Sequence, residues 1–374
     1  MDQATDFSTI TDLFDMRADF VHAYPYGSGH INDTFCAEYD QAGHRLRYIH
    51  QRINSRVFQK PVELMDNIQR VTAHNQALLK ERANPESLRR SLTLVPAKTG
   101  ESYAVDADGE YWRTYLFIER ARTYDKIESV AQARSAASAF GDFQRLASTL
   151  GGARLHETIP HFHDTPKRFD ALNRAIERDP LNRASEAKEE IEFYESQYSR
   201  LSYIVDQLDS GAISERVTHN DTKLNNVMID DFSGEGICVI DLDTVMPGCA
   251  LYDFSDMVRT ATNSAAEDEP DARKVHMLLP MMEAILSGYL STAGRFLNEN
   301  EKASLAPGAS LLTLECGIRF LTDFLEGDTY FKIHRQGHNL DRCRTQVALA
   351  QSIHRQEKEI ESMVREACGR IGES

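Results

Sequence analysis

Three polar residues near the middle of the chain have the types and spacing that phosphoryl transfer requires. Asp221 and Asn226 belong to a His-x-Asp-x4-Asn pattern that begins at His219, and Asp241 belongs to an Ile-Asp-x-Asp pattern further on. Phosphoryl transfer needs a carboxylate that accepts the proton of the attacking hydroxyl, and oxygen ligands for the magnesium ions on the phosphates. The spacing therefore indicates Asp221 as catalytic base and Asn226 and Asp241 as Mg²⁺ ligands.

A β-hairpin is predicted to bring these residues together. Residues 227–229 and 237–240 are short apolar runs on either side of the turn-forming segment Ser-Gly-Glu-Gly at 233–236. Pairing of the two strands would place Asn226 beside Asp241, with the predicted base a few residues upstream. Acidic residues around a hairpin also occur as turn formers and solvated strand ends. Two spaced motifs at opposite ends of one hairpin favour the metal site.

The order of the remaining elements predicts an α+β protein with two lobes. Pro61 suits the first position of a helix, and apolar residues recur after it at helical spacing. Beyond residue 122 the chain is mostly helical, for example at 131–150, with the hairpin as an interruption. Strand signals are confined largely to the first part, at 21–26, 34–39, 47–53, 102–105 and 111–118.

Composition narrows the class of protein. The 374 residues are 41% hydrophobic and 27% charged, as in ordinary globular domains, and no apolar run approaches the ~20 residues of a membrane span. A net charge of −16 argues against nucleic acid or an anionic membrane as partner. The acidic first twenty residues lack the pattern of a signal peptide, and the six scattered cysteines favour reduced thiols. We expect a cytoplasmic protein, either a monomer or a weak homo-oligomer.

The catalytic motifs resemble those of the aminoglycoside phosphotransferase and choline kinase superfamily. Longer strings are similar to N-acetylhexosamine 1-kinases. The resemblance implies a bilobal protein-kinase-like fold, with an N-terminal nucleotide-binding lobe at 1–122 and a helical lobe at 123–374 that carries the catalytic loop, metal site and sugar site. It also implies ATP and Mg²⁺ as cofactors and the anomeric hydroxyl of N-acetylglucosamine or N-acetylgalactosamine as acceptor. The strings are Tyr-Gly-Ser-Gly-His-Ile-Asn at 26–32, Phe-Gly-Asp-Phe-Gln at 140–144, His-Phe-His-Asp-Thr-Pro at 161–166, 218–226, 240–248, and 315–317 through 330–331.

The nucleotide is expected to contact the first lobe at two places. Gly27, Ser28 and Gly29 lie between two predicted strands, where glycine lets backbone N–H groups approach phosphate oxygens. A plain hairpin turn would show the same pattern. The hinge that receives adenine is predicted at 117–120 and includes Glu119.

The third strand departs from the superfamily pattern. A lysine or arginine usually stands there to hold the α- and β-phosphates, but this chain has Gln51, with Arg52 on the opposite face by strand alternation. Either Arg52, Arg56 or the metal meets the phosphate charge, or the register of this strand is shifted by one residue. Glu63 or Asp66 on the following helix would be the acid that pairs with that cation. Without the cation, this ion-pair role is not expected.

Sugar contacts are expected from the second lobe. Arg319 and Asp323 stand four residues apart on one face of a predicted helix, and a guanidinium suits paired hydroxyls. A surface ion pair would have the same spacing. The resemblance assigns Arg319 and Tyr330 to the sugar, whereas Asp323 is added from the helix face.

Three further residues are predicted to contact the substrate. His30 and Asn32 follow the glycine turn and are within reach of either the γ-phosphate or the sugar, and Lys223 lies two residues beyond the predicted base. His-x-His at 161–163 has a spacing known from zinc sites, but a structural loop is favoured because no matching further ligands are visible.

Two other functions remain open. The first is a different kinase of the same superfamily, acting on choline, homoserine, a methylthiosugar or an aminoglycoside. Choline requires an aromatic cage and aminoglycosides require an acidic cleft, for which the acidic cluster at 267–271 is a candidate. The second is a binding module with a decayed kinase site, which the intact catalytic motifs argue against.

Overall fold

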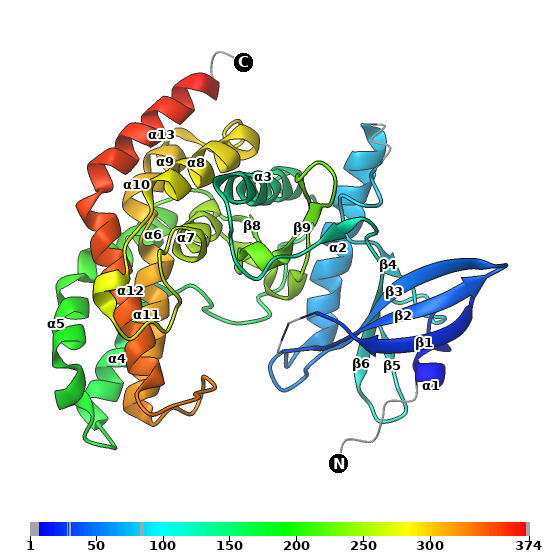
Figure 1. Ribbon diagram of the computed structural model, residues 1–374, viewed down its shortest axis with the longest axis horizontal. Helices are drawn as coiled ribbons and strands as arrows, with labels where there is room; N and C mark the ends of the chain where they lie inside the picture. The colour runs from blue at the N-terminus through cyan, green and yellow to red at the C-terminus, as the bar shows by residue number, and fades with distance from the viewer. Residues whose placement is uncertain (1–6, 28, 30, 83–85, 372–374) are drawn as a thin grey trace.

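The computed structural model describes residues 7–27, 29, 31–82 and 86–371. An antiparallel sheet and one long helix form the N-terminal part, and a bundle of helices forms the C-terminal part (Figure 1). This arrangement confirms the predicted α+β class with a β-rich first part and a helical second part.

The N-terminal sheet has the strand order β1-β2-β3-β6-β4, with β5 paired to β6. All of these pairings are antiparallel, and Gln51 on β3 lies opposite Thr34 on β2 and Arg113 on β6. Predicted and observed strands agree closely, except for the two-residue β4, which is too short to show a sequence pattern. The strands are β1 (Asp19–Pro25), β2 (Asp33–Gln41), β3 (His44–Arg52), β4 (Leu94–Val95), β5 (Ala104–Val105) and β6 (Tyr111–Leu116).

Helix α2 (Pro61–Glu81) connects the sheet to the helical part. Pro61 occupies its first turn, as predicted, and Leu64, Ile68 and Val71 are buried along one face. These side chains belong to the same core cluster as residues of the helical part, so one hydrophobic core runs across both parts. Figure 1 shows α2 lying between the sheet and α3 (Val130–Ala147).

The helical part is built around α3, which packs along α8. This part also contains two small sheets, one with the strand order β10-β9-β7 and one that pairs β11 with β8. The strands are β7 (Ala121–Arg122), β8 (Arg216–Thr218), β9 (Val227–Asp230), β10 (Gly236–Val239) and β11 (Met246–Gly248). The helices are α1 (Phe7–Thr11) in the N-terminal part, then α4 (Thr165–Arg178), α5 (Lys188–Ser196), α6 (Tyr198–Asp209), α7 (Ala250–Ala261), α8 (Leu279–Ala293), α9 (Glu299–Ala303), α10 (Leu305–Gly308), α11 (Leu311–Glu326), α12 (His338–Arg355) and α13 (Glu357–Ile371), with 3₁₀ turns η1 (Ala184–Ala187), η2 (Leu224–Asn226), η3 (Leu242–Thr244) and η4 (Ala272–Lys274).

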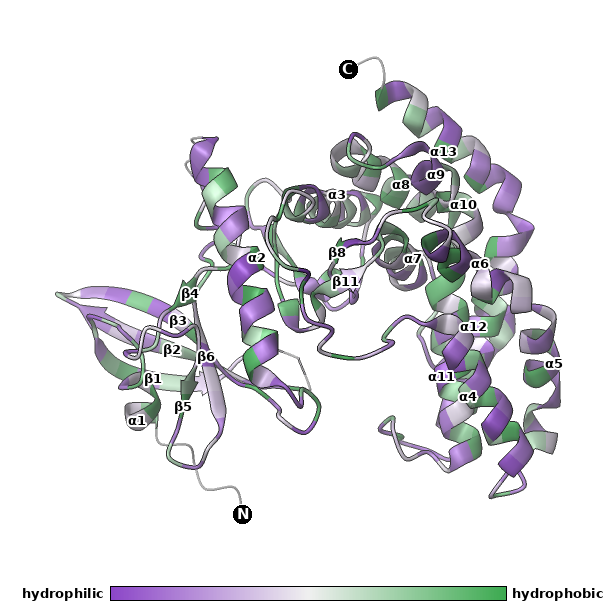
Figure 2. Cartoon of the chain, turned by 180° about the vertical axis from the view of Figure 1, so that it is seen from behind, coloured by the Kyte–Doolittle hydropathy of each residue, from purple (hydrophilic) through white to green (hydrophobic). Residues whose placement is uncertain are grey.

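The helices at the edge of the molecule carry both hydrophilic and hydrophobic residues. Hydrophilic and hydrophobic residues alternate along α5 and α13 at the edge of the molecule (Figure 2). On α13 one face is apolar and turned inward, since Ile360 and Val364 are buried. Among the described residues, no helix combines the length and the apolar character that crossing a membrane requires.

The predicted division after residue 122 stays a prediction. Ala121 and Arg122, placed by that division in the first lobe, form β7 and pair with Asp230 and Ile229 of β9 in the helical part. The chain therefore enters the second part through a strand of the catalytic hairpin's own sheet.

The contact between α3 and α8 generates a stability prediction. A Cβ added at Gly288 would lie 2.2 Å from the backbone oxygen of Arg134, so Gly288→Ala forces two helices apart. We expect a loss of about 1–3 kcal/mol, as for other overpacked cores, measured by thermal or urea unfolding. Gly369→Ala on α13 is the control, because nothing lies within 4 Å of its added Cβ. Equal stability of the Gly288 variant and the control would contradict the packing described.

Candidate active site

The β9–β10 hairpin brings the three predicted catalytic residues together. Val239 of β10 pairs with Val227 of β9, and the Ile240 N–H donates to the Asn226 carbonyl over 2.9 Å. Asn226 ends η2 just before β9, and Asp241 lies two residues after the end of β10, at the start of η3. The Asn226 side chain also contacts Asp221.

Asp221 is held by two neighbours on the catalytic loop. The Asn226 side-chain Nδ2 donates to the Asp221 backbone carbonyl over 2.8 Å and to its carboxylate over 3.1 Å. Lys223 Nζ lies 2.8 Å from Asp221 Oδ1. Burial alone would lower the pKa of Lys223, but the Asp221 carboxylate raises it, so the lysine stays charged. Asp221 remains partly exposed (27% of the side chain) and is accessible to an incoming hydroxyl.

Asp241 lies where negative charge is concentrated. Its backbone is left-handed (φ 58°), and its side chain opens to solvent. Partial desolvation by the surrounding protein, together with the carboxylates of Asp243 and Asp221, raises the pKa of Asp241 to about 6. A divalent cation would relieve this repulsion.

The donor set fits magnesium. Asn226 and Asp241 offer a carboxamide and a carboxylate, the hard oxygen ligands that Mg²⁺ prefers. No group of three or more His, Cys, Asp or Glu side chains is placed to hold a metal within the described ranges. A magnesium ion here would therefore take only one or two carboxylates from the protein and complete its shell with phosphate oxygens or water, as this ion commonly does.

Two aspartates of α7 fix the backbone of the catalytic loop. Asp253 accepts hydrogen bonds from the N–H groups of His219 (3.0 Å) and Asn220 (2.7 Å), and Asp256 accepts from that of Thr222 (2.8 Å). Both carboxylates are buried. Sequence reasoning missed them, although an Asp-x-x-Asp pair on a helix that follows the second motif was a usable signal.

His219 supports the loop from the other side. Its Nε2 lies 2.9 Å from the carbonyl oxygen of Ile240, the residue before Asp241. Phe140 and Phe143 of α3 meet its ring edge-on, with ring centroids 5.5 and 5.8 Å away. The buried histidine thus links the two motifs and has no open path to a substrate.

The predicted nucleotide residues are dispersed. Gly27 has a left-handed backbone (φ 83°), which glycine adopts without strain, and Gly29 follows it, while Ser28 and His30 lie outside the described residues. Glu119 forms an exposed ion pair with Arg47 at the rim.

Arg52 forms an ion pair with Asp33 over 2.5 Å, and both side chains are exposed. By strand alternation Arg52 points to the face of β3 opposite to that of Gln51. The nucleotide-binding role expected for Arg52 therefore has no support from its position. Glu63 and Asp66 on α2 contact Lys60 and His156 respectively, so neither forms the ion pair with a strand cation that the superfamily pattern would give.

Asn32 connects the glycine turn to the second aspartate of the Ile-Asp-x-Asp motif. Its Nδ2 donates to Asp243 Oδ2 over 2.5 Å, and its Oδ1 accepts from the Asn54 N–H over 3.0 Å. The structure thus brings Asn32 to the metal side of the cleft.

The predicted sugar residues gather at the end of α11. The guanidinium of Arg319 lies 5.9 Å from the ring centroid of Tyr330 and 5.4 Å from that of Phe331. Asp323 is buried and accepts hydrogen bonds from the N–H groups of Tyr330 (2.7 Å) and Phe331 (2.9 Å). Both of its oxygens are engaged in holding the loop that carries Tyr330, and the sugar contact expected for Asp323 stays a prediction.

Helix α11 is also tied to the catalytic loop. Glu315 Oε1 lies 2.8 Å from His163 Nδ1, and His163 Nε2 lies 3.2 Å from the carbonyl oxygen of Asn220. Glu315 precedes Arg319 by one helical turn. The His-Phe-His-Asp loop therefore fixes the helix that presents Arg319 relative to Asp221.

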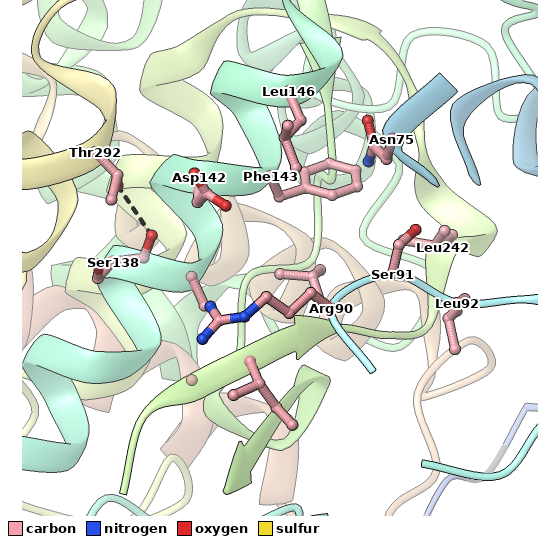
Figure 3. A pocket seen from close by; sticks show the side chains of 14 residues that line it. Asn75, Arg90, Ser91, Leu92, Ser138, Asp142, Phe143, Leu146, Leu242 and Thr292 are labelled. Carbon is pink, nitrogen blue, oxygen red and sulfur yellow. Dashed lines mark hydrogen bonds between the residues drawn. The ribbon is translucent and has the colours of Figure 1, made fainter. Parts of the chain in front are cut away.

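Two cavities flank the catalytic loop, and neither is lined by Asp221, Asn226 or Asp241. One, of about 220 Å³, lies behind the hairpin, where Arg90, Phe143 and Leu242 point toward it (Figure 3). The other, of about 370 Å³, lies between the 157–164 loop and α6. Neither contains a residue predicted to bind nucleotide or sugar.

The fold and this site define a phosphotransferase with a protein-kinase-like architecture. Residues 22–287 match the family described as "Phosphotransferase enzyme family". The chain belongs to that family.

Solved structures share the whole architecture. An aminoglycoside phosphotransferase from Alicyclobacillus acidocaldarius is similar with a TM-score of 0.60 at 9% identity, over 99% of this chain and 98% of that one. A microcompartment-associated aminopropanol kinase gives 0.53 at 16%, over 95% and 98%. A choline kinase from Cryptosporidium parvum gives 0.52 at 14%, over 90% and 89%. At these identities the likeness establishes the fold.

The raised pKa of Asp241 predicts how metal binding depends on pH. Because this carboxyl takes a proton near pH 6, Mg²⁺-dependent nucleotide binding should fall by about tenfold per pH unit below that value. Asp241→Asn should weaken the same binding at pH 7.5, with partial recovery in excess magnesium, and should show less pH dependence. Calorimetric titrations between pH 5 and 8 provide the comparison, in which protonation of the nucleotide is common to both proteins.

The metal-free proteins give a second readout of the same group. A carboxyl whose folded-state pKa lies above its unfolded value loses stability as the pH rises through that interval, here from about 4 to about 6. Without metal, Asp241→Asn should therefore unfold at higher urea concentration than wild type at pH 8. A variant that keeps the full magnesium response would remove Asp241 from the metal site.

Proposed function

We propose that this protein uses Mg²⁺ and ATP to phosphorylate the anomeric hydroxyl of an N-acetylhexosamine, N-acetylglucosamine or N-acetylgalactosamine. The observation that carries the proposal is the connection between Asp221 and Arg319. A chain of contacts through Asn220, His163 and Glu315 holds the two elements together. A base and a hydroxyl-binding guanidinium are thereby presented by one rigid unit.

Asp221 would accept the proton of the attacking hydroxyl. Lys223 and Asn226 hold its carboxylate, which restricts the directions from which a hydroxyl can approach. Mg²⁺ held by Asn226 and Asp241 would neutralise charge on the transferred phosphate. Since the anomeric hydroxyl is the most acidic on the ring, a single carboxylate suffices to deprotonate it.

ATP would lie under the glycine turn with its adenine at the hinge. The carbonyl of Glu119 accepts from Arg89 over 3.0 Å and that of Arg120 accepts from the Asp231 N–H over 3.0 Å. No hydrogen bond from another described residue engages the peptide groups of Ile118. These groups are the candidates for the adenine edge.

Arg319 and Tyr330 would bind the sugar on the far side of its ring. The guanidinium lies beside two aromatic rings, and an aromatic surface with a planar donor is suited to a pyranose that has one apolar face and several hydroxyls. Asp323 and the loop it holds preset the position of Tyr330, so less order has to be gained on binding.

A different acceptor of the same superfamily is the alternative. For an aminoglycoside, the acidic cluster at 267–271 would have to face the substrate. In the structure Glu267 pairs with Arg259 and Glu269 with Lys274, and Arg335 lies 3.8 Å from Asp268, so local cations already offset the charge of this cluster. This observation favours the neutral sugar over a polycationic substrate.

Loss of the base tests the chemistry. Asp221→Asn keeps the shape of the side chain but cannot accept a proton, and turnover should fall by about 10²–10⁴-fold with nucleotide binding nearly unchanged. ADP release is measured with a panel of N-acetylhexosamines, unsubstituted hexoses, choline and an aminoglycoside. Near-normal turnover in the variant would exclude Asp221 as base, and faster turnover of choline or the aminoglycoside would exclude the proposed acceptor.

Loss of the guanidinium tests the sugar site. If Arg319 binds ring hydroxyls equally in the ground and transition states, Arg319→Ala should raise the sugar KM about 10–100-fold and change kcat less. Arg365→Ala on α13 is the matched control, because that arginine is exposed and pairs only weakly with Glu361, over 3.7 Å. An unchanged sugar KM in Arg319→Ala would move the sugar site elsewhere while leaving the kinase assignment intact.

A further inference from the structure

The third strand has no cation where a kinase needs one. Gln51 faces the cleft side of β3, and its Nε2 donates to Thr34 Oγ1 over 2.9 Å. Its Oε1 accepts from Arg113 Nε over 2.9 Å. Arg113 is the direct cross-strand neighbour of Gln51 on β6, so the glutamine side chain orients a guanidinium that comes from the adjacent strand.

Arg113 is a fully buried cation with capacity to bind further acceptors. Its side chain is 0% exposed, its Nη1 pairs with Asp243 Oδ1, and its Nη2 has no hydrogen-bond partner among the described residues. Burial by itself would lower the pKa of Arg113, but the carboxylates of Asp243 and Asp241 raise it, so the charge is permanent. A buried guanidinium nitrogen without an acceptor is costly unless a ligand provides one.

Three other cations of the sheet and the catalytic loop are paired with carboxylates. Arg52 pairs with the exposed Asp33 of β2, and Lys223 pairs with Asp221. Arg47 pairs with Glu119 at the rim. Arg113 is thus the cation that the sheet brings next to the Asp241–Asp243 motif.

We propose that Arg113 binds the α- and β-phosphates of the nucleotide, in place of the absent strand lysine. The inference rests on the proposed function, and it specifies the cation on which that function depends. Asp243 accepts from Arg113 at one oxygen and from Asn32 at the other, so the guanidinium lies at a carboxylate two residues beyond Asp241. Nη2 is enclosed by protein atoms, so the phosphate contact requires a local rearrangement around the guanidinium.

Binding of a nucleotide series distinguishes a phosphate contact from a structural role. Adenosine, AMP and ADP are titrated against wild type, Arg113→Met and Arg113→Lys, with Arg52→Met as control. A phosphate contact predicts that Arg113→Met weakens ADP binding about 10–100-fold and leaves adenosine binding unchanged. Arg113→Lys should retain most of the ADP affinity, and Arg52→Met should match wild type.

A double variant keeps the test decisive if the single variant does not fold. Removal of Arg113 leaves Asp243 buried without its cation, which is strongly destabilising. Arg113→Met combined with Asp243→Asn removes both charges and should fold, still with weakened ADP binding. Adding Gln51→Lys to that protein places a lysine on β3 and should restore ADP affinity.

Three results would count against the inference. They are equal weakening of adenosine and ADP, no weakening of either, and no recovery with Gln51→Lys. Wild-type protein that binds adenosine and ADP equally tightly would instead overturn the proposed use of ATP, so the two failures can be told apart.

Discussion

The catalytic loop depends on two buried carboxylates of α7. Asp253 and Asp256 receive the backbone N–H groups of three loop residues, and Gln144 adds a side-chain donor to Asp253 over 2.6 Å. A buried carboxylate is tolerated only when donors surround it, so these hydrogen bonds fix the loop as strictly as they satisfy the charge. The left-handed backbone of Asn220 (φ 65°) persists because of this support.

The same principle explains how the sheet is coupled to the site. Asn67 of α2 is fully buried and donates to the carbonyls of Val245 (3.0 Å) and His156 (2.8 Å), both in the helical part. Asp243 receives Arg113 and Asn32 from the sheet side. These polar contacts join the N-terminal part to the helical part at specific atoms. The hydrophobic core around α2 also holds the two parts together, but apolar contacts do not fix their relative position as precisely. A shift of the sheet must therefore be accompanied by exchange of the hydrogen bonds at Asp243.

The sequence allowed the local part of this arrangement to be predicted. Strands, α2 and the hairpin follow from periodicity and turn residues, and the hairpin alone places Asn226 beside Asp241. Contacts between distant segments have no such signal. In the sequence, Arg113 is a polar residue within a largely apolar strand. Only the register of β3 and β6 shows that it faces Gln51. Asp323 has the spacing of a surface ion pair with Arg319, yet the loop at 328–331 turns back onto it and engages its carboxylate. Arg52 pairs with an exposed carboxylate on the neighbouring strand, and its nucleotide contact stays a prediction.

The position of the transferred phosphate tests the central claim most directly. Asp221 can deprotonate only the hydroxyl directed at it by the sugar contacts on α11, and the account assigns this hydroxyl to the anomeric carbon. Proton–phosphorus correlation NMR of the product formed from Mg²⁺, ATP and N-acetylglucosamine or N-acetylgalactosamine identifies the attached carbon. The account predicts coupling of phosphorus to the anomeric proton and loss of the reducing end. Coupling to the protons at carbon 6, with a product that still reduces, would contradict it.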